Sequence, residues 1–213
     1  MIKIENRVIP SPEQWEAVIM GCRNPFNSHD KSDSEWNVEH PDIFYVGKKD
    51  LTLMNRLANA GDDHGKFMRM LPVIVDITAP HYWWPEMDQY KVGTVTDSCS
   101  KMHTLLQKEF TLDDFSYSDL TKMATEQTIT RLNFLRDKYL KEDDERVKKV
   151  IWRGVLEMLP LSYNQKRTWS GNYQVLKRIY WARRGHKLVE WKSFLDFIET
   201  LPYAKELIIG EVE

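Results

Sequence analysis

Residues 64–103 read HGKFMRMLPVIVDITAPHYWWPEMDQYKVGTVTDSCSKMH, and this segment decides the predicted fold. Its stretch LPVIVDI, residues 71–77, is rich in β-branched side chains and predicts a buried strand. Thr78-Ala79-Pro80 then places a proline just behind a short polar residue, a pattern that predicts the start of a helix. Residues 93–98 are polar and turn-like. The segment therefore predicts a strand, a helix and a turn in succession.

Residues 2–37, which precede this segment, predict one strand, one helix and one loop. Residues 2–9 alternate in part between apolar and polar side chains, as a short strand does. Ser11 followed by a proline and an acid predicts a helix start, and that helix runs to about Arg23. Residues 24–37 are rich in Asn, Ser and Asp and predict a loop, whose role the sequence does not indicate.

Helical periodicity dominates the rest of the chain. Helices are predicted over residues 51–60, 117–158, 172–184 and 187–200. Asp50 or Thr52 would cap the first of them, and the second is expected to break near Lys141–Asp144, where Asp143 or Asp144 is the expected cap. The second half of the chain is therefore expected to be largely helical.

Length and composition set further limits. A chain of 213 residues with 42% hydrophobic side chains can bury a core as one α/β domain over residues 1–213. The net charge of -2 gives no global attraction to nucleic acid or to membranes, so we expect neither as a partner. Cys22 and Cys99 are too few for a disulfide framework and lack metal-ligand spacing, so no metal site is predicted. Without an apolar targeting segment or an 18-residue apolar run, the protein is expected to be soluble and cytoplasmic.

Several side chains could contribute to a binding site, and each also has a structural interpretation. Lys91 and Lys101 flank a hydroxyl-rich turn that could cradle a phosphate. Cys99 has no base nearby in sequence to activate it, and on its own it is expected to be a small buried residue. The aromatic residues beside the strand are expected in the core, namely Tyr82, Trp83 and Trp84. The cations on the helix over 172–184 are expected in solvent, namely Lys177, Arg178, Arg183 and Arg184.

The stretch QYKVGTVTDSCSKM, residues 89–102, resembles the signature of flavin-dependent thymidylate synthases. That signature reads R-H-R, two residues, S, one residue, N-E, one residue, S, one residue, R. Its spacing is kept without a gap, and the matching positions hold Gln89, Tyr90, Lys91, Thr94, Thr96, Asp97, Cys99 and Lys101. Flanking blocks follow in the family's order: His64, the strand 71–77, Ala79-Pro80 and Glu86 upstream, and Leu159-Pro160-Leu161, Trp169, Ser170, Asn172, Gln174, Leu176 and Arg183 downstream.

The resemblance implies both a fold and an activity. The fold would be the α+β thymidylate synthase-complementing protein fold, with a central antiparallel sheet and a largely helical second half. The activity would be reductive methylation at C5 of dUMP or a related pyrimidine nucleotide. FAD would be the cofactor, and NADPH and methylenetetrahydrofolate the co-substrates, so that the cofactor carries the redox chemistry. The resemblance also implies a homotetramer whose sites are shared between subunits.

Residue roles follow from the same resemblance. The residues expected along the flavin are His64, Gln89, Tyr90, Lys91 and Asn172. The residues expected around the nucleotide are Glu86, Asp97, Cys99, Lys101, Gln174 and Arg183. Arg183 is best placed for the pyrimidine ring, and Arg183 and Cys99 are the candidate catalytic residues.

Departures from the family pattern leave a second function open. Gln89 and Gln174 stand where the family has arginine, so two permanent charges and their bidentate reach are lost. Charge-assisted hydrogen bonds contribute about 1.5–3 kcal/mol each, so nucleotide or FAD affinity would fall unless other cations compensate. The alternative is a catalytically altered family member that binds or sequesters a nucleotide without synthase activity. A third interpretation is a structural homologue whose pocket has an unrelated ligand.

Overall fold

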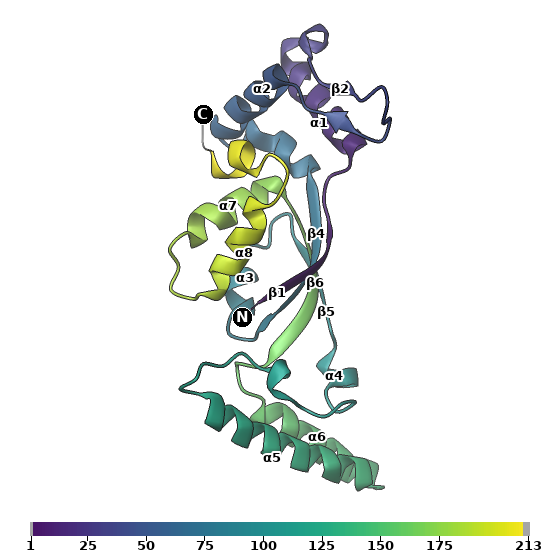
Figure 1. Cartoon of the computed structure of the whole chain (residues 1–213). Helices are drawn as coiled ribbons and strands as arrows, with labels where there is room; N and C mark the ends of the chain where they lie inside the picture. Colours follow the sequence, from purple (N-terminus) through teal and green to yellow (C-terminus); the bar gives the residue numbers. More distant parts are fainter. Residues whose placement is uncertain (1, 211–213) are drawn as a thin grey trace. The chain divides into compact units, whose positions relative to one another are not determined.

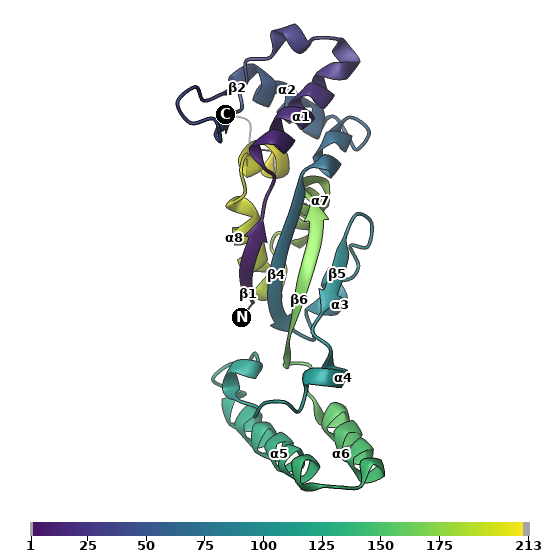
Figure 2. The ribbon, with the colours of Figure 1, turned by 90° about the vertical axis from the view of Figure 1, so that its right-hand side faces the viewer.

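Four strands form the central sheet of the computed structural model, which describes residues 2–210 except the side chain of residue 103. The strands are β1 (Lys3–Val8), β4 (Pro72–Pro80), β5 (Val95–Ser98) and β6 (Asn164–Asn172). Their order in the sheet is β1-β4-β6-β5, and neighbouring strands run antiparallel (Figure 2). A second sheet pairs β2 (Glu35–Trp36) with β3 (Phe44–Tyr45) in antiparallel register, Glu35 opposite Tyr45. The predicted mixed fold with a central antiparallel sheet is confirmed.

Two units emerge from the contacts within the described chain. Unit 1 comprises residues 2–3, 77–89 and 97–167, and unit 2 comprises residues 4–76, 90–96 and 168–210. Each strand of the four-stranded sheet contributes residues to both units.

Unit 1 contains an antiparallel helical hairpin made of α5 (Lys122–Lys141) and α6 (Glu145–Met158), drawn in green in Figure 1. The side chain of Asp144 accepts a hydrogen bond from the backbone N–H of Arg146, as expected of a cap. Leu132 and Val155 of the hairpin belong to a core of buried apolar residues that also contains Leu105, Leu106, Phe110 and Phe115. Shorter helices of this unit are α3 (Trp84–Met87), α4 (Lys101–Thr104) and a 3-10 turn over Leu112–Asp114.

Unit 2 contains the remaining helices, namely α1 (Pro12–Arg23), α2 (Lys48–Asn59), α7 (Tyr173–Arg183) and α8 (Glu190–Glu199). Ser11 and Gln14 form a reciprocal capping box at the start of α1, and the side chain of Asn172 caps α7. The unit also has 3-10 turns over Asn24–Phe26, His29–Lys31 and Gly65–Met70 and a π-helical turn over Lys205–Ile209. These helices agree with the periodicity of the sequence.

Two predictions about the segment 64–103 were wrong. Ala79 and Pro80 end strand β4 and are buried, so they do not begin a helix. Proline is tolerated at a strand end, and the carbonyl of Ala79 instead accepts a hydrogen bond from Trp84 Nε1 at 3.1 Å. Residues 95–98 are strand β5 because they pair with β6, a partner far away in sequence.

The cap predicted for α2 was also wrong. The helix begins at Lys48, and the carboxylate of Asp33 accepts hydrogen bonds from the backbone N–H groups of Lys49 and Asp50 at 2.9 and 3.1 Å. A side chain from the preceding loop therefore satisfies the free donors of the first turn. Asp50 itself is buried inside the helix and pairs with Arg23.

Two of the three aromatic residues beside β4 lie in the core, as predicted, whereas Tyr82 is half-buried. Trp83 and Trp84 have 0% and 1% of their surface exposed. Trp84 Nε1 also donates to the carbonyl of Gln165 at 3.1 Å, so its polar atom is satisfied in the interior. In contrast, Cys99 was expected to be buried and is exposed, and it directly follows the edge strand β5.

Candidate functional site

Arg183 ends helix α7 in unit 2 and is fixed by two aromatic rings. Its Nε donates a hydrogen bond to the hydroxyl of Tyr90 at 2.9 Å. The guanidinium carbon lies 4.7 Å from the centre of the Trp191 ring and 5.4 Å from that of Tyr90. Both distances are within the range of cation–π attraction. The partly exposed guanidinium is therefore held in one orientation.

Tyr90 reaches Arg183 from a tight turn that packs on the start of α7. The hydroxyl of Thr94 donates to the carbonyl of Tyr90 and closes the turn. Gly93 has a φ of +78°, which favours glycine, and a Cβ at this position would lie 3.1 Å from Nδ2 of Asn172. Asn172 accepts the N–H of Val175 through Oδ1 at 3.1 Å. Its Oδ1 therefore has a structural role, whereas its amino group faces the turn.

Gln174 lies beside a cavity of about 450 Å³ in unit 2. The cavity is lined by polar and aromatic side chains that include Asn59, Asp62, Gln174, Lys177, Arg178 and Trp181. Arg69 donates to the amide oxygen of Gln174, so a guanidinium is present near the position where the family has arginine. Burial lowers the pKa of Lys177, which donates to the carbonyl of Ala58 at 2.9 Å.

Other predicted residues of unit 2 are more open. His64 and Lys91 are both exposed, and within residues 2–210 neither side chain forms a hydrogen bond or ion pair. His64 directly precedes the 3-10 turn Gly65–Met70, and Lys91 follows Tyr90 in its turn. Both positions are free to contact a ligand.

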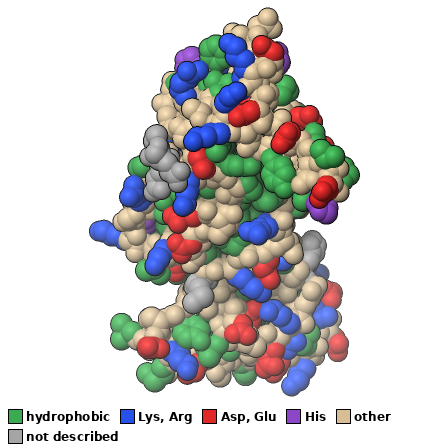
Figure 3. All heavy atoms as spheres, turned by 45° about the horizontal axis from the view of Figure 1, so that its top comes forward, with side chains coloured by type: hydrophobic (Ala, Val, Ile, Leu, Met, Phe, Trp, Pro, Cys, Tyr) green, Lys and Arg blue, Asp and Glu red, His purple; other side chains and the backbone are tan. Residues whose placement is uncertain are grey.

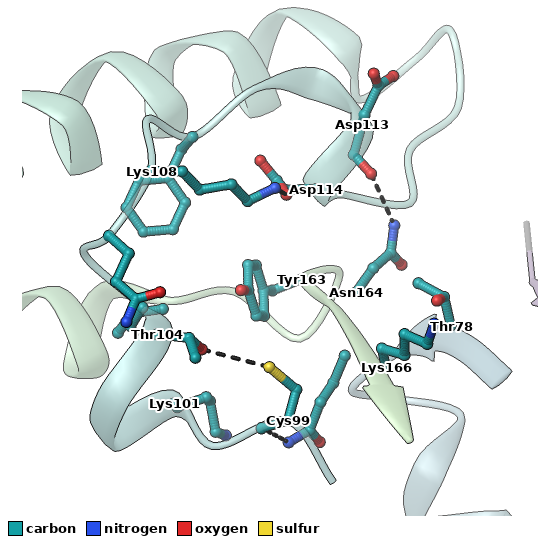
Figure 4. Close-up of a pocket in the computed structure, with 14 residues that line it drawn as sticks. Thr78, Cys99, Lys101, Thr104, Lys108, Asp113, Asp114, Tyr163, Asn164 and Lys166 are labelled. Atoms are coloured by element: carbon teal, nitrogen blue, oxygen red, sulfur yellow. Dashed lines mark hydrogen bonds and ion pairs between the residues drawn. The ribbon is translucent and has the colours of Figure 1, made fainter. Parts of the chain in front are cut away.

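Cys99 and Lys101 line a cavity of about 380 Å³ in unit 1, shown in Figure 4. The Cys99 Sγ lies 3.4 Å from the hydroxyl oxygen of Thr104. The Cys99 backbone is held on both sides, because its N–H donates to the carbonyl of Lys166 and its carbonyl accepts from Gln165 Nε2. Burial, and then the charge of Arg167, lower the pKa of Lys101. The thiol and the ammonium group thus share one pocket.

The last three predicted residues also belong to unit 1. Glu86 is half-buried in the single turn of α3, whereas Gln89 and Asp97 are exposed. Glu86 accepts the backbone N–H of Gln89 through its carbonyl at 3.4 Å. Their expected roles toward a nucleotide or flavin stay predictions.

Sequence reasoning missed a polar cluster in unit 1. Arg167 donates from Nη1 to both carboxylate oxygens of Asp88 at 3.0 and 3.2 Å, and its guanidinium lies 4.2 Å from the Trp84 ring centre. Nearby His81 stacks on Tyr163 with ring centres 5.8 Å apart. Asp88 and Arg167 are 79 residues apart and form no motif, so their pairing could not be predicted from the sequence.

His81 is held in its neutral form. Its buried Nε2 has no hydrogen-bond partner among the described residues. Burial, followed by the charges of Lys101 and Arg167, lowers the pKa of His81 to about 4. At neutral pH the imidazole is therefore uncharged, and it acts as an aromatic packing partner of Tyr163.

Residues 2–210 contain no group of three or more His, Cys, Asp or Glu side chains arranged to hold a metal ion. Among the same residues, every helix is too short or too polar to cross a membrane. Cations and acids are interspersed over the face drawn in Figure 3.

Comparison with solved structures identifies the fold. Thymidylate synthase X (ThyX) from Helicobacter pylori with FAD and dUMP has a TM-score of 0.70 and 16% identity, over 97% of this chain and 96% of that chain. A second structure, the flavin-dependent thymidylate synthase ThyX from Helicobacter pylori complexed with FAD and dUMP, has the same score and identity over 100% and 99%. No protein-family model and no curated protein matches the chain. The chain therefore has a ThyX-like fold, as the motif blocks predicted.

Proposed function

We propose that this protein is an FAD-dependent enzyme that methylates C5 of dUMP or a related pyrimidine nucleotide. The observation that supports this most is Arg183, an identity with the family signature, whose guanidinium is fixed by Tyr90 and Trp191. Solved structures with the same fold contain FAD and dUMP. A preorganised guanidinium, which carries five N–H donors in a planar fork, suits the carbonyl oxygens of a pyrimidine ring.

The cavity beside α7, whose lining includes the predicted nucleotide-binding residue Gln174, is chemically suited to a ligand that joins phosphate to an aromatic ring. Lys177 and Arg178 bring positive charge for phosphate oxygens, and the amide of Gln174 offers N–H donors. The indole of Trp181 offers a flat apolar surface for a ring. When bound, FAD would supply the hydride, with NADPH as its reductant and methylenetetrahydrofolate as the source of the carbon unit.

Each predicted residue has a distinct task in this proposal. Five would hold the flavin: His64, Gln89, Tyr90, Lys91 and Asn172. Arg183 would bind and orient the pyrimidine ring, and five others would bind the rest of the nucleotide: Glu86, Asp97, Cys99, Lys101 and Gln174. The exposed Cys99 thiol would serve as a weak hydrogen-bonding group, because a flavin route needs no cysteine nucleophile. A homotetramer with sites shared between subunits belongs to the same proposal.

A second candidate function is nucleotide binding without catalysis. Gln174 is neutral and already accepts a hydrogen bond from Arg69. Lys91 is exposed and replaces the forked guanidinium that the family signature has at this position. A weaker phosphate contact at Lys91, which is expected along the flavin, would favour loss of the flavin before loss of the nucleotide, since FAD carries more phosphate to anchor.

Flavin content and reaction chemistry separate the two candidates. Absorbance of the purified protein, before and after addition of FAD and gel filtration, tests cofactor binding. Tritium release from C5-labelled dUMP with FAD, NADPH and methylenetetrahydrofolate then tests the reaction, and the Arg183→Ala variant is the control. Bound flavin with tritium release supports the synthase. Absence of flavin binding rules it out, and dUMP binding by calorimetry in that case would favour the second function.

A further inference from the structure

A separate cavity of about 540 Å³ lies in unit 2 between α2 and the turns that follow α1. Its lining includes Arg23, Phe26, Lys31, Lys49, Thr52 and Arg56. Four of these side chains are cationic, and no carboxylate is among the described residues that line it. Such a lining is unusual for a chain whose net charge is -2, and it concentrates positive potential in a concavity.

Only one of the four cations is neutralised inside the protein. Arg23 is buried, and its Nε lies 2.5 Å from the carboxylate of Asp50. Its other N–H groups donate to the backbone carbonyls of Ser28 and Lys31 at 3.1 and 2.9 Å. In contrast, the side chains of Lys31, Lys49 and Arg56 form no ion pair with any carboxylate of residues 2–210. Three charges therefore remain available at the cavity.

The wall of the cavity is preorganised by the same buried pair. The carboxylate of Asp50 accepts hydrogen bonds from the hydroxyls of Ser32 and Ser34 at 2.7 and 2.6 Å and from the N–H of Ser34 at 3.1 Å. Asp33 is engaged at the start of α2 by the N–H groups of Lys49 and Asp50. These bonds fix the loop over residues 24–37 against α2. Lys31 and Lys49 are thus presented by an ordered frame, and less entropy is lost when a ligand binds.

An aromatic ring completes the lining. Phe26 is 53% exposed, although large aromatic side chains are usually covered. The guanidinium carbon of Arg56 lies 5.9 Å from the centre of its ring. A flat apolar surface beside three cations matches a ligand that joins a planar ring to more than one phosphate.

We propose that this cavity binds a nucleoside di- or triphosphate. Its phosphates would contact Lys31, Lys49 and Arg56, and its base would lie on Phe26. A chain of two or three phosphates supplies the charge that three cations require, whereas a single phosphate leaves part of the cavity charge unmatched. This cavity shares no lining residue with the one beside α7 and none with the Arg183 cluster, so the proposal is independent of the synthase activity.

Isothermal titration calorimetry of the full chain with ADP, tripolyphosphate and adenosine tests this site. Saturating dUMP is included in a second series, and it should leave ADP binding unchanged. The double variant Lys31→Ala/Lys49→Ala removes two exposed cations that form no side-chain bonds, so folding should be preserved. Lys187→Ala/Lys192→Ala removes two exposed cations elsewhere in unit 2 and is the matched control. Phe26→Leu keeps apolar bulk and removes the ring.

The expected results are specific to each arm. ADP and tripolyphosphate bind with one site per chain and adenosine does not. The Lys31/Lys49 variant weakens both by at least about tenfold, since each lost cation removes a charge-assisted contact, and the control variant does not. Phe26→Leu weakens ADP but leaves tripolyphosphate unchanged. The proposal is overturned if ADP does not bind, if the control variant weakens it equally, or if only a single-stranded oligonucleotide binds through Lys31 and Lys49.

Discussion

Arg183 combines three interactions that a lysine could not reproduce together: a hydrogen bond to Tyr90 and stacking on two rings. We expect Arg183→Lys to weaken dUMP binding by about ten- to a hundredfold, because the fork that holds both the tyrosine and the ligand is lost. Calorimetric titration with dUMP measures this. Arg184→Lys is the control, since Arg184 also lies over a ring, 5.4 Å from the centre of Trp181. Equal losses in both variants would contradict a specific role for Arg183.

The lowered pKa of His81 makes the stability of the folded protein depend on pH. In the folded protein burial and the charges of Lys101 and Arg167 lower the pKa of His81 to about 4. The pKa of a histidine in an unfolded chain is about 6.5. The unfolded chain therefore binds more protons between these values, so the free energy of unfolding is highest above about pH 6.5 and falls as the pH drops toward about 4. After allowance for solvent screening, His81 accounts for about 1–2 kcal/mol of this fall.

Urea unfolding at several pH values between 4 and 7 tests this contribution. The variant His81→Phe keeps a ring to stack on Tyr163 and cannot titrate, so its stability should depend less on pH across this range. His40→Gln replaces an exposed histidine and should leave the pH dependence as it is in the parent protein. If His81→Phe retains the full slope, His81 is not the group responsible.

Single residues show how far the sequence could predict the site. Asn172 and Arg183 were predicted as site residues because they are identities with the family pattern. The structure places Asn172 at the start and Arg183 at the end of α7, and their roles toward a ligand stay predictions. Trp191 was expected only as part of an amphipathic helix, since its contact with Arg183 depends on how α7 and α8 pack. Pairings over long sequence separations leave no periodic pattern, which is why Arg167 and its partner Asp88 were missed.

At the scale of secondary structure, local signals predicted the helices better than the strands. Capping residues and apolar spacing mark α1, α6 and α7 within the sequence itself. Strand β6 reads NQKRTWSGN, which has few β-branched residues, and it exists because β4 and β5 lie on its two sides. Strand β5 depends on the same pairing. Tertiary pairing thus overrode weak local preference in both strands.

The loop over residues 24–37 and helix α2 act as one element, and Asp50 connects them. Asp50→Asn would leave the buried guanidinium of Arg23 without a counter-charge and weaken the hydrogen bonds from Ser32 and Ser34. Although burial by itself raises the pKa of Asp50, these hydrogen bonds hold it below its usual value, so the carboxylate is charged. Breaking a buried pair in this way costs about 3–5 kcal/mol.

Urea unfolding measures that cost, and hydrogen exchange of residues 24–37 locates it. Glu157→Gln is the matched control, because it removes the carboxylate from an exposed pair in which Arg153 Nε lies 2.8 Å from Glu157. Exposed pairs contribute about 0–1 kcal/mol. Equal effects of the two substitutions, or unchanged exchange in the loop, would show that the Arg23–Asp50 pair does not fix this element.

At the scale of the whole molecule, this chain differs from the ThyX structures far more in sequence than in fold. The ThyX-like fold is retained at 16% identity over nearly the full length. Apolar positions of strands and helices need only suitable volume and spacing, so they tolerate extensive exchange. Ligand-binding positions need particular functional groups. Replacement of arginine by Gln89 and Gln174 therefore bears on activity far more than on the fold.

The assembly of whole chains gives the last prediction. We expect a homotetramer in solution, and unit 1 has apolar side chains that an assembly would cover. Leu120, Met123 and Val150 are 93%, 70% and 70% exposed. Full burial of such a side chain contributes about 1.5–3 kcal/mol, so Leu120→Gln/Met123→Gln should shift the assembly toward smaller species.

Light scattering across a range of protein concentrations measures the mass of the assembly. Val38→Gln, at a position 98% exposed in unit 2, is the control and should leave the mass unchanged. A parent protein that stays monomeric at every concentration would rule out sites shared between subunits.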